Sequence, residues 1–128
     1  MVAQSINRVK HDSDVTRHAE VVAISAAQRA LGSTSLDDCV IYSSAEPCVF
    51  CSYAIRESRI GRIVYGLHSP HMGGLSKWNV LGDEGISRNM PEVFAPPPTG
   101  ENQLWTLRSI DGSRYGRAGQ VFYTTAEV

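Results

Sequence analysis

The feature that most constrains the fold of this chain is a strand–helix–strand pattern between residues 39 and 67. The run CVIYS at 39–43 is rich in β-favouring residues, and RIGRIVYGL at 59–67 returns to a strand. Between them, Pro47 suits the first position of a helix, where its missing N–H leaves no intrahelical bond unmade, and VFCSYAIRES continues that helix. Strand, helix and strand within about 30 residues predict a βαβ unit with parallel strands and a right-handed crossover.

A second helix is predicted at residues 16–31, ahead of this unit. Its apolar residues recur at spacings of three and four and therefore line one face, at Val21, Ile24, Ala27 and Leu31. Asp14 and Thr16 are both suitable amino-terminal caps, and Gly32 tolerates the left-handed turn that often closes a helix. Together the two patterns indicate an α/β fold in which helices cover the sheet.

The remaining segments give weaker signals. HSPHMGG at 68–74 is typical of a turn-rich loop, and APPPTG at 95–100 fits neither a helix interior nor a central strand. Residues 75–81 predict at most a short helix, and QVFYTT at 120–125 predicts a late strand. Because no repeat or domain boundary is evident, we expect residues 1–128 to form a single domain.

Length and charge narrow the classes of protein that this chain could be. Its 128 residues, 42% of them apolar, are enough for one domain with its own core. The formal net charge of -1 lacks the basic excess of dedicated nucleic-acid binders, so a small substrate is favoured. With three cysteines, no secretory pattern at the start and no apolar run near the roughly 20 residues that span a bilayer, we expect a reduced, cytoplasmic protein without a membrane segment.

The stretch EPCVFC places Cys48 and Cys51 three positions apart at a predicted helix start, which is a spacing typical of half a zinc site. Upstream, His18 at the start of the other predicted helix is the candidate third ligand. A set of one histidine and two cysteines leaves the fourth tetrahedral position of zinc open, as in catalytic sites. Cys39, inside a predicted strand, is interpreted as a core residue. A redox C-x-x-C pair is the alternative interpretation, although such sites do not need a histidine in a preceding helix.

Glu20 follows His18 by two residues, about 200° around an ideal helix, so the two side chains must straddle the first turn. This suits different tasks: His18 would bind the metal, and Glu20 would accept a proton from metal-activated water and pass it to a leaving group. The free N–H groups and positive dipole end of the other helix favour Cys48 and Cys51 as thiolates. Both helix starts are therefore predicted to face one metal ion.

His18-x-Glu20 followed by Pro47-Cys48-x-x-Cys51 resembles the signature of the zinc-dependent cytidine/deoxycytidylate deaminase superfamily. DVTRHAEVVAI and LDDCVIYSSAEPCVFC are most similar to the branch of tRNA adenosine, guanine and cytosine deaminases, over about residues 5–75. The resemblance implies a three-layer α/β/α fold with a central mixed sheet, a Zn²⁺ cofactor and a homodimer. It also implies that hydroxide adds to the ring carbon bearing an exocyclic amine, that Glu20 protonates the ring and then the amine, and that ammonia leaves.

The same resemblance implies a set of substrate-binding residues. Asn7 stands eleven residues before His18, where these enzymes carry an asparagine that hydrogen-bonds the base or sugar, although a turn role is equally compatible with its position. The backbone carbonyl of Ala45 or Glu46 is expected to contact the reacting amine or water.

Two histidines in the loop after residue 67 invite a functional interpretation. For His68 and His71 a solvated turn is favoured, with His71 or Trp78 as a base-stacking wall in the alternative interpretation. His11 is expected at the surface.

The chain departs from the family pattern at both ends. Only six residues precede Asn7, so we expect an apparently shortened amino terminus that leaves a sheet edge and one face uncovered. Three explanations stay open: a shortened chain, a substitute supplied by residues 104–128, or cover by another subunit. Residues 76–128 form a divergent segment, and they leave the substrate poorly constrained.

The favoured function is therefore a zinc-dependent hydrolytic deaminase acting on a free nucleobase, nucleoside or related heterocycle, with guanine or cytosine as the leading type. One alternative is a tRNA adenosine-to-inosine deaminase, which predicts a basic stripe beside the pocket and strong salt dependence. Another is a zinc-binding scaffold with impaired catalysis.

Overall fold

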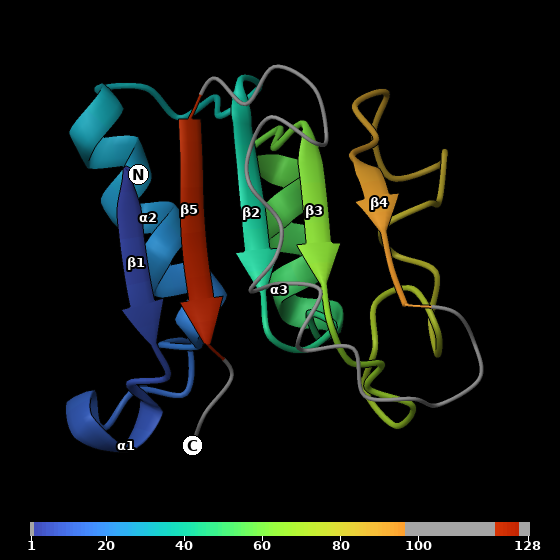
Figure 1. Cartoon of the computed structure of the whole chain (residues 1–128), viewed down its shortest axis with the longest axis horizontal. Helices are drawn as coiled ribbons and strands as arrows, with labels where there is room; N and C mark the ends of the chain where they lie inside the picture. The colour runs from blue at the N-terminus through green and yellow to red at the C-terminus, as the bar shows by residue number, and fades with distance from the viewer. Residues whose placement is uncertain (1, 97–119, 126–128) are drawn as a thin grey trace.

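The computed structural model describes residues 2–96 and 120–125. Along the chain, short strands alternate with helices, which confirms the predicted α/β class (Figure 1). The elements are β1 (Ala3–Ile6), α1 (Val9–Asp12), α2 (Ala19–Leu31), β2 (Cys39–Ser43), α3 (Val49–Glu57), β3 (Arg62–Tyr65), β4 (Glu92–Phe94) and β5 (Gln120–Thr125). The late strand at 120–125 is therefore also confirmed.

The strands of the described residues form one sheet with the order β1-β5-β2-β3-β4 (Figure 1). β2 and β3 pair in parallel, with Ile41 opposite Ile63, and α3 connects them, which confirms the βαβ unit. The other ladders are parallel too, so the expectation of a mixed sheet is wrong for these strands. Parallel neighbours need crossover connections rather than hairpins, and α2 and α3 lie on such connections.

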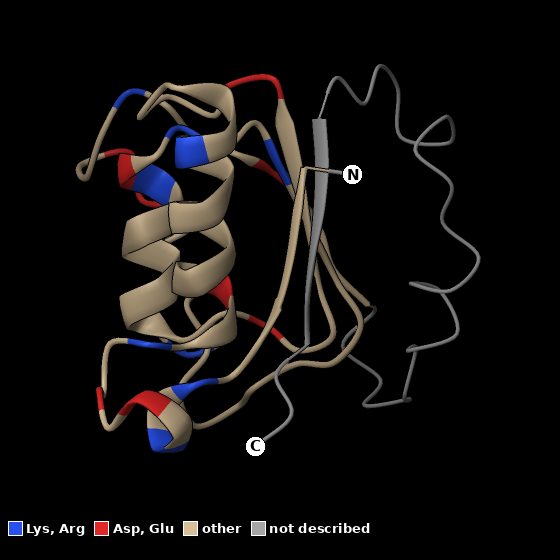
Figure 2. Cartoon of the chain, turned by 90° about the vertical axis from the view of Figure 1, so that its left-hand side faces the viewer, with Lys and Arg blue, Asp and Glu red and all other residues tan. Residues whose placement is uncertain are grey.

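The helices α2 and α3 both cover the same face of the sheet (Figure 2). Of the three layers expected from the resemblance, the described residues supply two, one of helices and one of strands. Among residues 2–96 and 120–125 there is no helix on the opposite face. The face that matters for the site is therefore the one that α2 and α3 share.

Both chain ends contribute strands to the sheet. We expected the few residues before Asn7 to leave the sheet edge without a strand, but Ala3–Ile6 form β1 at that edge. β5 then lies between β1 and β2, pairing with each in parallel. The segment 104–128, named in the second of the three explanations, therefore contributes a strand to this side of the sheet.

α2 begins at Ala19, three residues later than predicted, with His18 in the extended N-cap position. Neither predicted cap lies there, because Asp14 instead accepts hydrogen bonds from the N–H and hydroxyl of Thr16 at 2.8 and 2.6 Å in the turn before the helix. The helix ends as predicted at Gly32, whose φ of 62° is the left-handed conformation that glycine adopts without strain.

α3 begins at Val49 with Cys48 as its N-cap, so Pro47 precedes the helix instead of opening it. β3 is shorter than predicted because Arg59, at φ 60°, turns the chain sharply before the strand. The short helix expected at 75–81 does not form, and these residues make turns instead.

The core lies between the sheet and its helix layer. Its members are fully or almost fully buried and include Ala23, Ala27, Leu36, Ile41, Ile55, Ile63 and Leu81. Cys39 belongs to this cluster at 2% exposure, which confirms its interpretation as a core residue. Within the described part of the chain, no helix has the length and apolar character needed to cross a bilayer.

Candidate metal centre and its pocket

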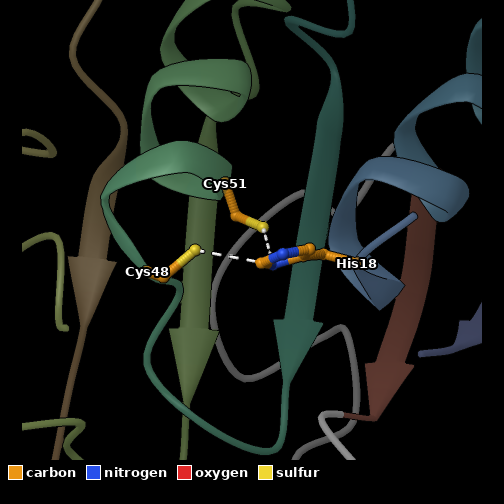
Figure 3. Close-up of side chains that lie close together, drawn as sticks. All are labelled: His18, Cys48 and Cys51. Carbon is orange, nitrogen blue, oxygen red and sulfur yellow. Dashed lines mark hydrogen bonds between the residues drawn. The ribbon is translucent and has the colours of Figure 1, made fainter. Parts of the chain in front are cut away.

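The two helix starts bring the three predicted ligands together (Figure 3). His18 is the N-cap of α2, Cys48 is the N-cap of α3, and Cys51 lies in the first turn of α3. The Nδ1 atom of His18 is 3.6 Å from the sulfur of Cys48 and 3.4 Å from that of Cys51. All three ligand atoms lie within 4.8 Å of one another, so one metal ion can reach them all. These three ligands were predicted from sequence spacing.

The chemistry of this donor set fits zinc. A hydrogen bond from the Cys51 thiol, together with backbone N–H groups at the start of α3 and the nearby His18, lowers the pKa of Cys48 to about 5. The pKa of Cys51 is raised, because it donates that hydrogen bond, is buried and lies beside the carboxylate of Glu20. One sulfur is therefore ready as a thiolate, and a bound cation would release the proton of the other. An imidazole and two thiolates are a ligand set that zinc prefers.

Glu20 lies beside these ligands with only 6% of its surface exposed. Its Oε2 atom is 3.2 Å from the sulfur of Cys51, and its Oε1 atom is 3.2 Å from the hydroxyl of Ser43. The same hydroxyl lies 2.6 Å from the carbonyl oxygen of Ala45, so its single proton can serve either acceptor. The position predicted for a proton carrier is therefore occupied by a buried carboxylate with one adjustable partner.

A pocket of about 430 Å³ opens onto the metal centre. His18 and Cys48 lie on one side of it, and the rest of its lining is largely apolar, comprising Val49, Phe50, His71, Met72 and Trp78. Phe50 packs edge-on against the ring of His18, with 5.4 Å between the ring centroids. The pocket therefore offers aromatic and aliphatic surface to a flat ring that reaches the metal.

The two residues proposed as a stacking wall, His71 and Trp78, both line this pocket. His68 does not line it; its Nε2 atom lies 2.9 Å from the carbonyl oxygen of Pro96. His11 is 71% exposed and contacts Asp12, as expected for a surface residue. The alternative interpretation of the loop thus gains geometric support for His71 and Trp78.

The other proposed substrate contacts have local partners. The side-chain oxygen of Asn7 accepts a hydrogen bond from the N–H of Val9 at 2.9 Å, which is the turn role. The N–H of Arg8 donates to the carbonyl of Arg17 at 2.9 Å, so this turn lies next to the start of α2. The carbonyl of Glu46 accepts a hydrogen bond from the hydroxyl of Ser69 at 3.1 Å. Substrate contacts through Asn7, Ala45 and Glu46 stay predictions.

Sequence reasoning missed four residues of the site: Ser43, Val49, Phe50 and Met72. Ser43 is the last residue of β2, and in parallel sheets the carboxyl ends of strands are where ligands bind, a signal that the sequence did offer. Val49, Phe50 and Met72 read as ordinary apolar residues. Only the folded arrangement shows that they face the pocket.

Comparison with known proteins agrees with this geometry. The family model "Cytidine and deoxycytidylate deaminase zinc-binding region" matches residues 1–67. The chain belongs to this zinc-dependent deaminase family, and its cofactor is zinc. This confirms the resemblance drawn from the two motifs.

Among its relatives is a tRNA-specific adenosine deaminase of Aquifex aeolicus (strain VF5), 33% identical over 97 residues, which are 75% of this chain and 64% of that protein. A guanine deaminase of Bacillus subtilis (strain 168) is 43% identical over 65 residues, covering 51% of this chain and 42% of that protein. The chain thus matches less than two thirds of the length of either relative.

Solved structures give the same two groups. A structure from studies of A-to-I editing by tRNA:A34 deaminases superposes with a TM-score of 0.65 at 31% identity, covering 74% of this chain and 73% of that one. A guanine deaminase from Nitrosomonas europaea superposes with a TM-score of 0.57 at 27% identity, covering 71% and 55%. The fold and the branch of the family are therefore those expected from the sequence.

Proposed function

We propose that this chain hydrolyses the exocyclic amino group of a nucleobase and releases ammonia. The observation that carries the proposal is the buried carboxylate of Glu20, 3.2 Å from the sulfur of Cys51, in a metal centre whose other two ligands, His18 and Cys48, line an apolar pocket. A structural zinc site needs no such carboxylate, whereas hydrolysis needs a group that moves protons beside the metal.

His18, Cys48 and Cys51 would hold the zinc ion. Bound in this way, zinc lowers the pKa of water to about 7 and so supplies a nucleophile at neutral pH. Glu20 takes a proton from the attacking water and delivers it to the ring nitrogen next to the reacting carbon. It then carries the second proton of that water to the amino group, so that a carbon–oxygen bond forms, the carbon–nitrogen bond breaks and ammonia leaves.

The substrate that we propose is an adenosine in tRNA. The sequence led us to favour a free base of the guanine or cytosine type, but the relatives and solved structures favour the tRNA alternative. A cationic side chain next to the pocket is in keeping with an RNA substrate, because Lys77 lies 5.5 Å from the ring of Trp78, which lines the pocket. The apolar wall suits a base that has been turned out of its stack.

A free guanine substrate is the second candidate. It is favoured by the 43% identity to the Bacillus guanine deaminase over 65 residues. The two candidates differ in salt dependence, because only a polyanionic substrate loses counterions on binding.

The test measures ammonia release by the zinc-loaded chain from an anticodon stem-loop RNA with adenosine at the wobble position, and from guanine, cytosine and their nucleosides. We expect turnover of the stem-loop that falls steeply between low and physiological salt. Turnover of guanine alone would transfer the proposal to the second candidate. If no member of the panel releases ammonia, the interpretation that remains is a zinc-binding scaffold with impaired catalysis.

We also propose a homodimer, as the resemblance implies. Three large apolar side chains on α3 support it by being well exposed in the single chain, namely Val49, Phe50 and Tyr53 at 36%, 45% and 52%. Sedimentation equilibrium of the zinc-loaded chain should give twice the mass of one chain, and a monomer at micromolar concentration would contradict the proposal.

A further inference from the structure

A buried carboxylate holds together the loop that forms the pocket wall. The side chain of Glu46, in the connection between β2 and α3, is 0% exposed. It accepts four hydrogen bonds, from the N–H groups of Ser69, Leu75 and Ser76 at 2.9, 2.9 and 2.7 Å and from the hydroxyl of Ser76 at 2.6 Å. Its nearest potential cation is His68, whose Nδ1 atom lies 3.5 Å away. The negative charge is thus stabilised mainly by donors from a single loop.

The loop also pairs with the start of α3. The N–H of Val49 donates to the carbonyl of Met72 at 3.1 Å, and the N–H of Gly74 donates to the carbonyl of Pro47 at 2.8 Å. Gly73 faces Cys48 in an isolated antiparallel bridge. The metal ligand Cys48 and the residues of the pocket wall are therefore neighbours across a short backbone ladder.

Two glycines make this close approach possible. A Cβ atom at Gly73 would collide with the carboxylate of Glu46, and one at Gly74 would collide with the side chain of Ser52. Any other residue at either position would push the loop away from the start of α3.

The residues that donate hydrogen bonds to Glu46 are close along the chain to the residues whose side chains line the pocket. The carbonyl of Ser69 accepts from the N–H of Met72 at 3.2 Å, and the carbonyl of Gly73 accepts from the N–H of Trp78 at 3.0 Å. His71 and Met72 thus follow the segment bound at Ser69. Trp78 follows the segment that is bound at Leu75 and Ser76.

We propose that Glu46 is a positioning residue that sets the pocket wall against the metal centre and so determines how tightly substrate binds. The inference rests on the proposed deaminase function, and it assigns to the side chain of Glu46 a role distinct from the backbone contact expected from sequence. Glu46 acts through the loop and does not touch the reacting atoms.

A substitution of Arg56 is the control that separates a positioning role of Glu46 from a general effect on the stability of the protein. Arg56 is 1% exposed, and its guanidinium donates to backbone carbonyls of a different loop segment, those of Val80, Leu81, Asp83, Ser87 and Asn89. None of these residues lines the pocket. Arg56 is therefore an equally buried charge that does not bind the wall segment directly, and it reaches that segment only through Val80 and Leu81, whose N–H groups donate to the carbonyls of Trp78 at 2.7 Å and Gly74 at 2.9 Å.

The substitution Glu46→Gln tests the arrangement atom by atom. All four partners of the Glu46 carboxylate are donors. The side-chain amide of glutamine has one acceptor oxygen and one NH₂ group that only donates, so the NH₂ group must face one of these donors. The least costly orientation keeps the oxygen toward Leu75 and the backbone of Ser76, lets the Ser76 hydroxyl accept, and leaves the N–H of Ser69 unpaired. Glu46→Ala loses all four bonds.

The first measurement is residue-resolved amide exchange of the full zinc-loaded chain. In Glu46→Gln we expect exchange of the Ser69 amide to rise by about tenfold while Leu75 and Ser76 stay protected, and in Glu46→Ala we expect all three and Trp78 to exchange faster. Zinc content should stay at one per chain. Unchanged exchange at Ser69 in both variants would overturn the proposal.

The second measurement is the kinetics of ammonia release from the wobble-adenosine stem-loop and from guanine. Glu46→Gln should raise KM by about tenfold and change kcat by less than about threefold, because the reacting groups stay in place while the wall shifts. Arg56→Lys should lower the midpoint of urea unfolding and raise KM by less than about threefold, because Arg56 contacts the wall segment only indirectly. A fall in kcat at constant KM for Glu46→Gln, or the same rise in KM for Arg56→Lys, would refute the positioning role.

The two arms separate this inference from the proposed function. Amide exchange can be measured without turnover. If the unsubstituted chain has no deaminase activity, that result contradicts the proposed function only. Amide exchange would then still decide whether Glu46 holds the wall.

Discussion

The two sides of the pocket are built in different ways. On the metal side, the ligands and Glu20 stand at the starts of two helices, and Cys51 and Glu20 are 0% and 6% exposed. On the wall side, Met72 and Trp78 lie in turns and are 59% and 52% exposed. The difference indicates that the groups for chemistry are fixed by regular elements, whereas the groups for recognition depend on a loop and on the few hydrogen bonds that hold it.

The largest effect should come from removing a ligand on the metal side. Cys51→Ala leaves two ligands, and we expect the zinc content to fall from one per chain to near zero, with loss of all turnover. Cys39→Ala is the matched control, since it removes a buried thiol that lies in the core. Atomic absorption after dialysis measures the metal, and full zinc content in Cys51→Ala would break the comparison.

Glu20→Gln should give the next largest effect. The amide keeps the size of the side chain but cannot carry a proton, so we expect kcat to fall by about 10² to 10⁴ while zinc is retained. Glu57→Gln, at an exposed position of α3, should leave kcat unchanged. Steady-state ammonia release measures both, and a drop of less than about tenfold would show that another group moves the proton.

On the wall side, Trp78→Ala should act on binding rather than on chemistry. We expect KM to rise by about tenfold with little change in kcat, because stacking on an aromatic ring contributes about 1 to 3 kcal/mol per base. Leu31 is a suitable control, being 39% exposed and absent both from the pocket lining and from the apolar patch of α3. If Leu31→Ala raises KM as much as Trp78→Ala does, Trp78 does not contact the base.

The smallest effect concerns the thiol that binds no metal. Burial, with the nearby charges of Asp38 and Asp37, raises the pKa of Cys39 to about 11 from an ordinary value of 9.0. The folded state therefore favours the neutral thiol, and this contribution is present below pH 9 and is lost as the pH rises toward 11. Relative to Cys39→Val, the unsubstituted chain should lose about 2 kcal/mol of unfolding free energy over that window.

Urea titrations at pH 8 and pH 10.5 measure this difference. Equal losses in the two proteins would mean that the thiol ionises freely in the folded state. It would then resemble the ligating Cys48 more closely than a core residue.

The metal side could be read from the sequence because its information is local. The periodicity of apolar residues and the residues typical of helix starts indicate where the two helices begin. These positions carry Pro47, the two cysteines after it, and the histidine before Ala19. The wall could not be read in this way. Residues 75–81 carry a plausible helical pattern but form turns, and the carboxylate that binds the N–H groups of Leu75 and Ser76 comes from Glu46, far away in sequence.

The sheet shows the same division between local and distant information. The strand at 120–125 was predicted from its β-favouring composition, yet its place between β1 and β2 is set by pairing with distant segments. β1 was missed because AQSI is short and has little of the hydrophobic alternation that marks a strand. Register and neighbour order are properties of the assembled sheet.

The position of β5 also governs the order of events during protein synthesis. A nascent chain that has emerged only as far as β4 already contains every metal ligand, but β1 and β2 have no strand between them. Until β5 is synthesised, the edges of β1 and β2 that it will occupy are unpaired, so they can pair with other chains. A chain in which β5 is displaced is therefore expected to expose two unpaired strand edges and to aggregate more readily.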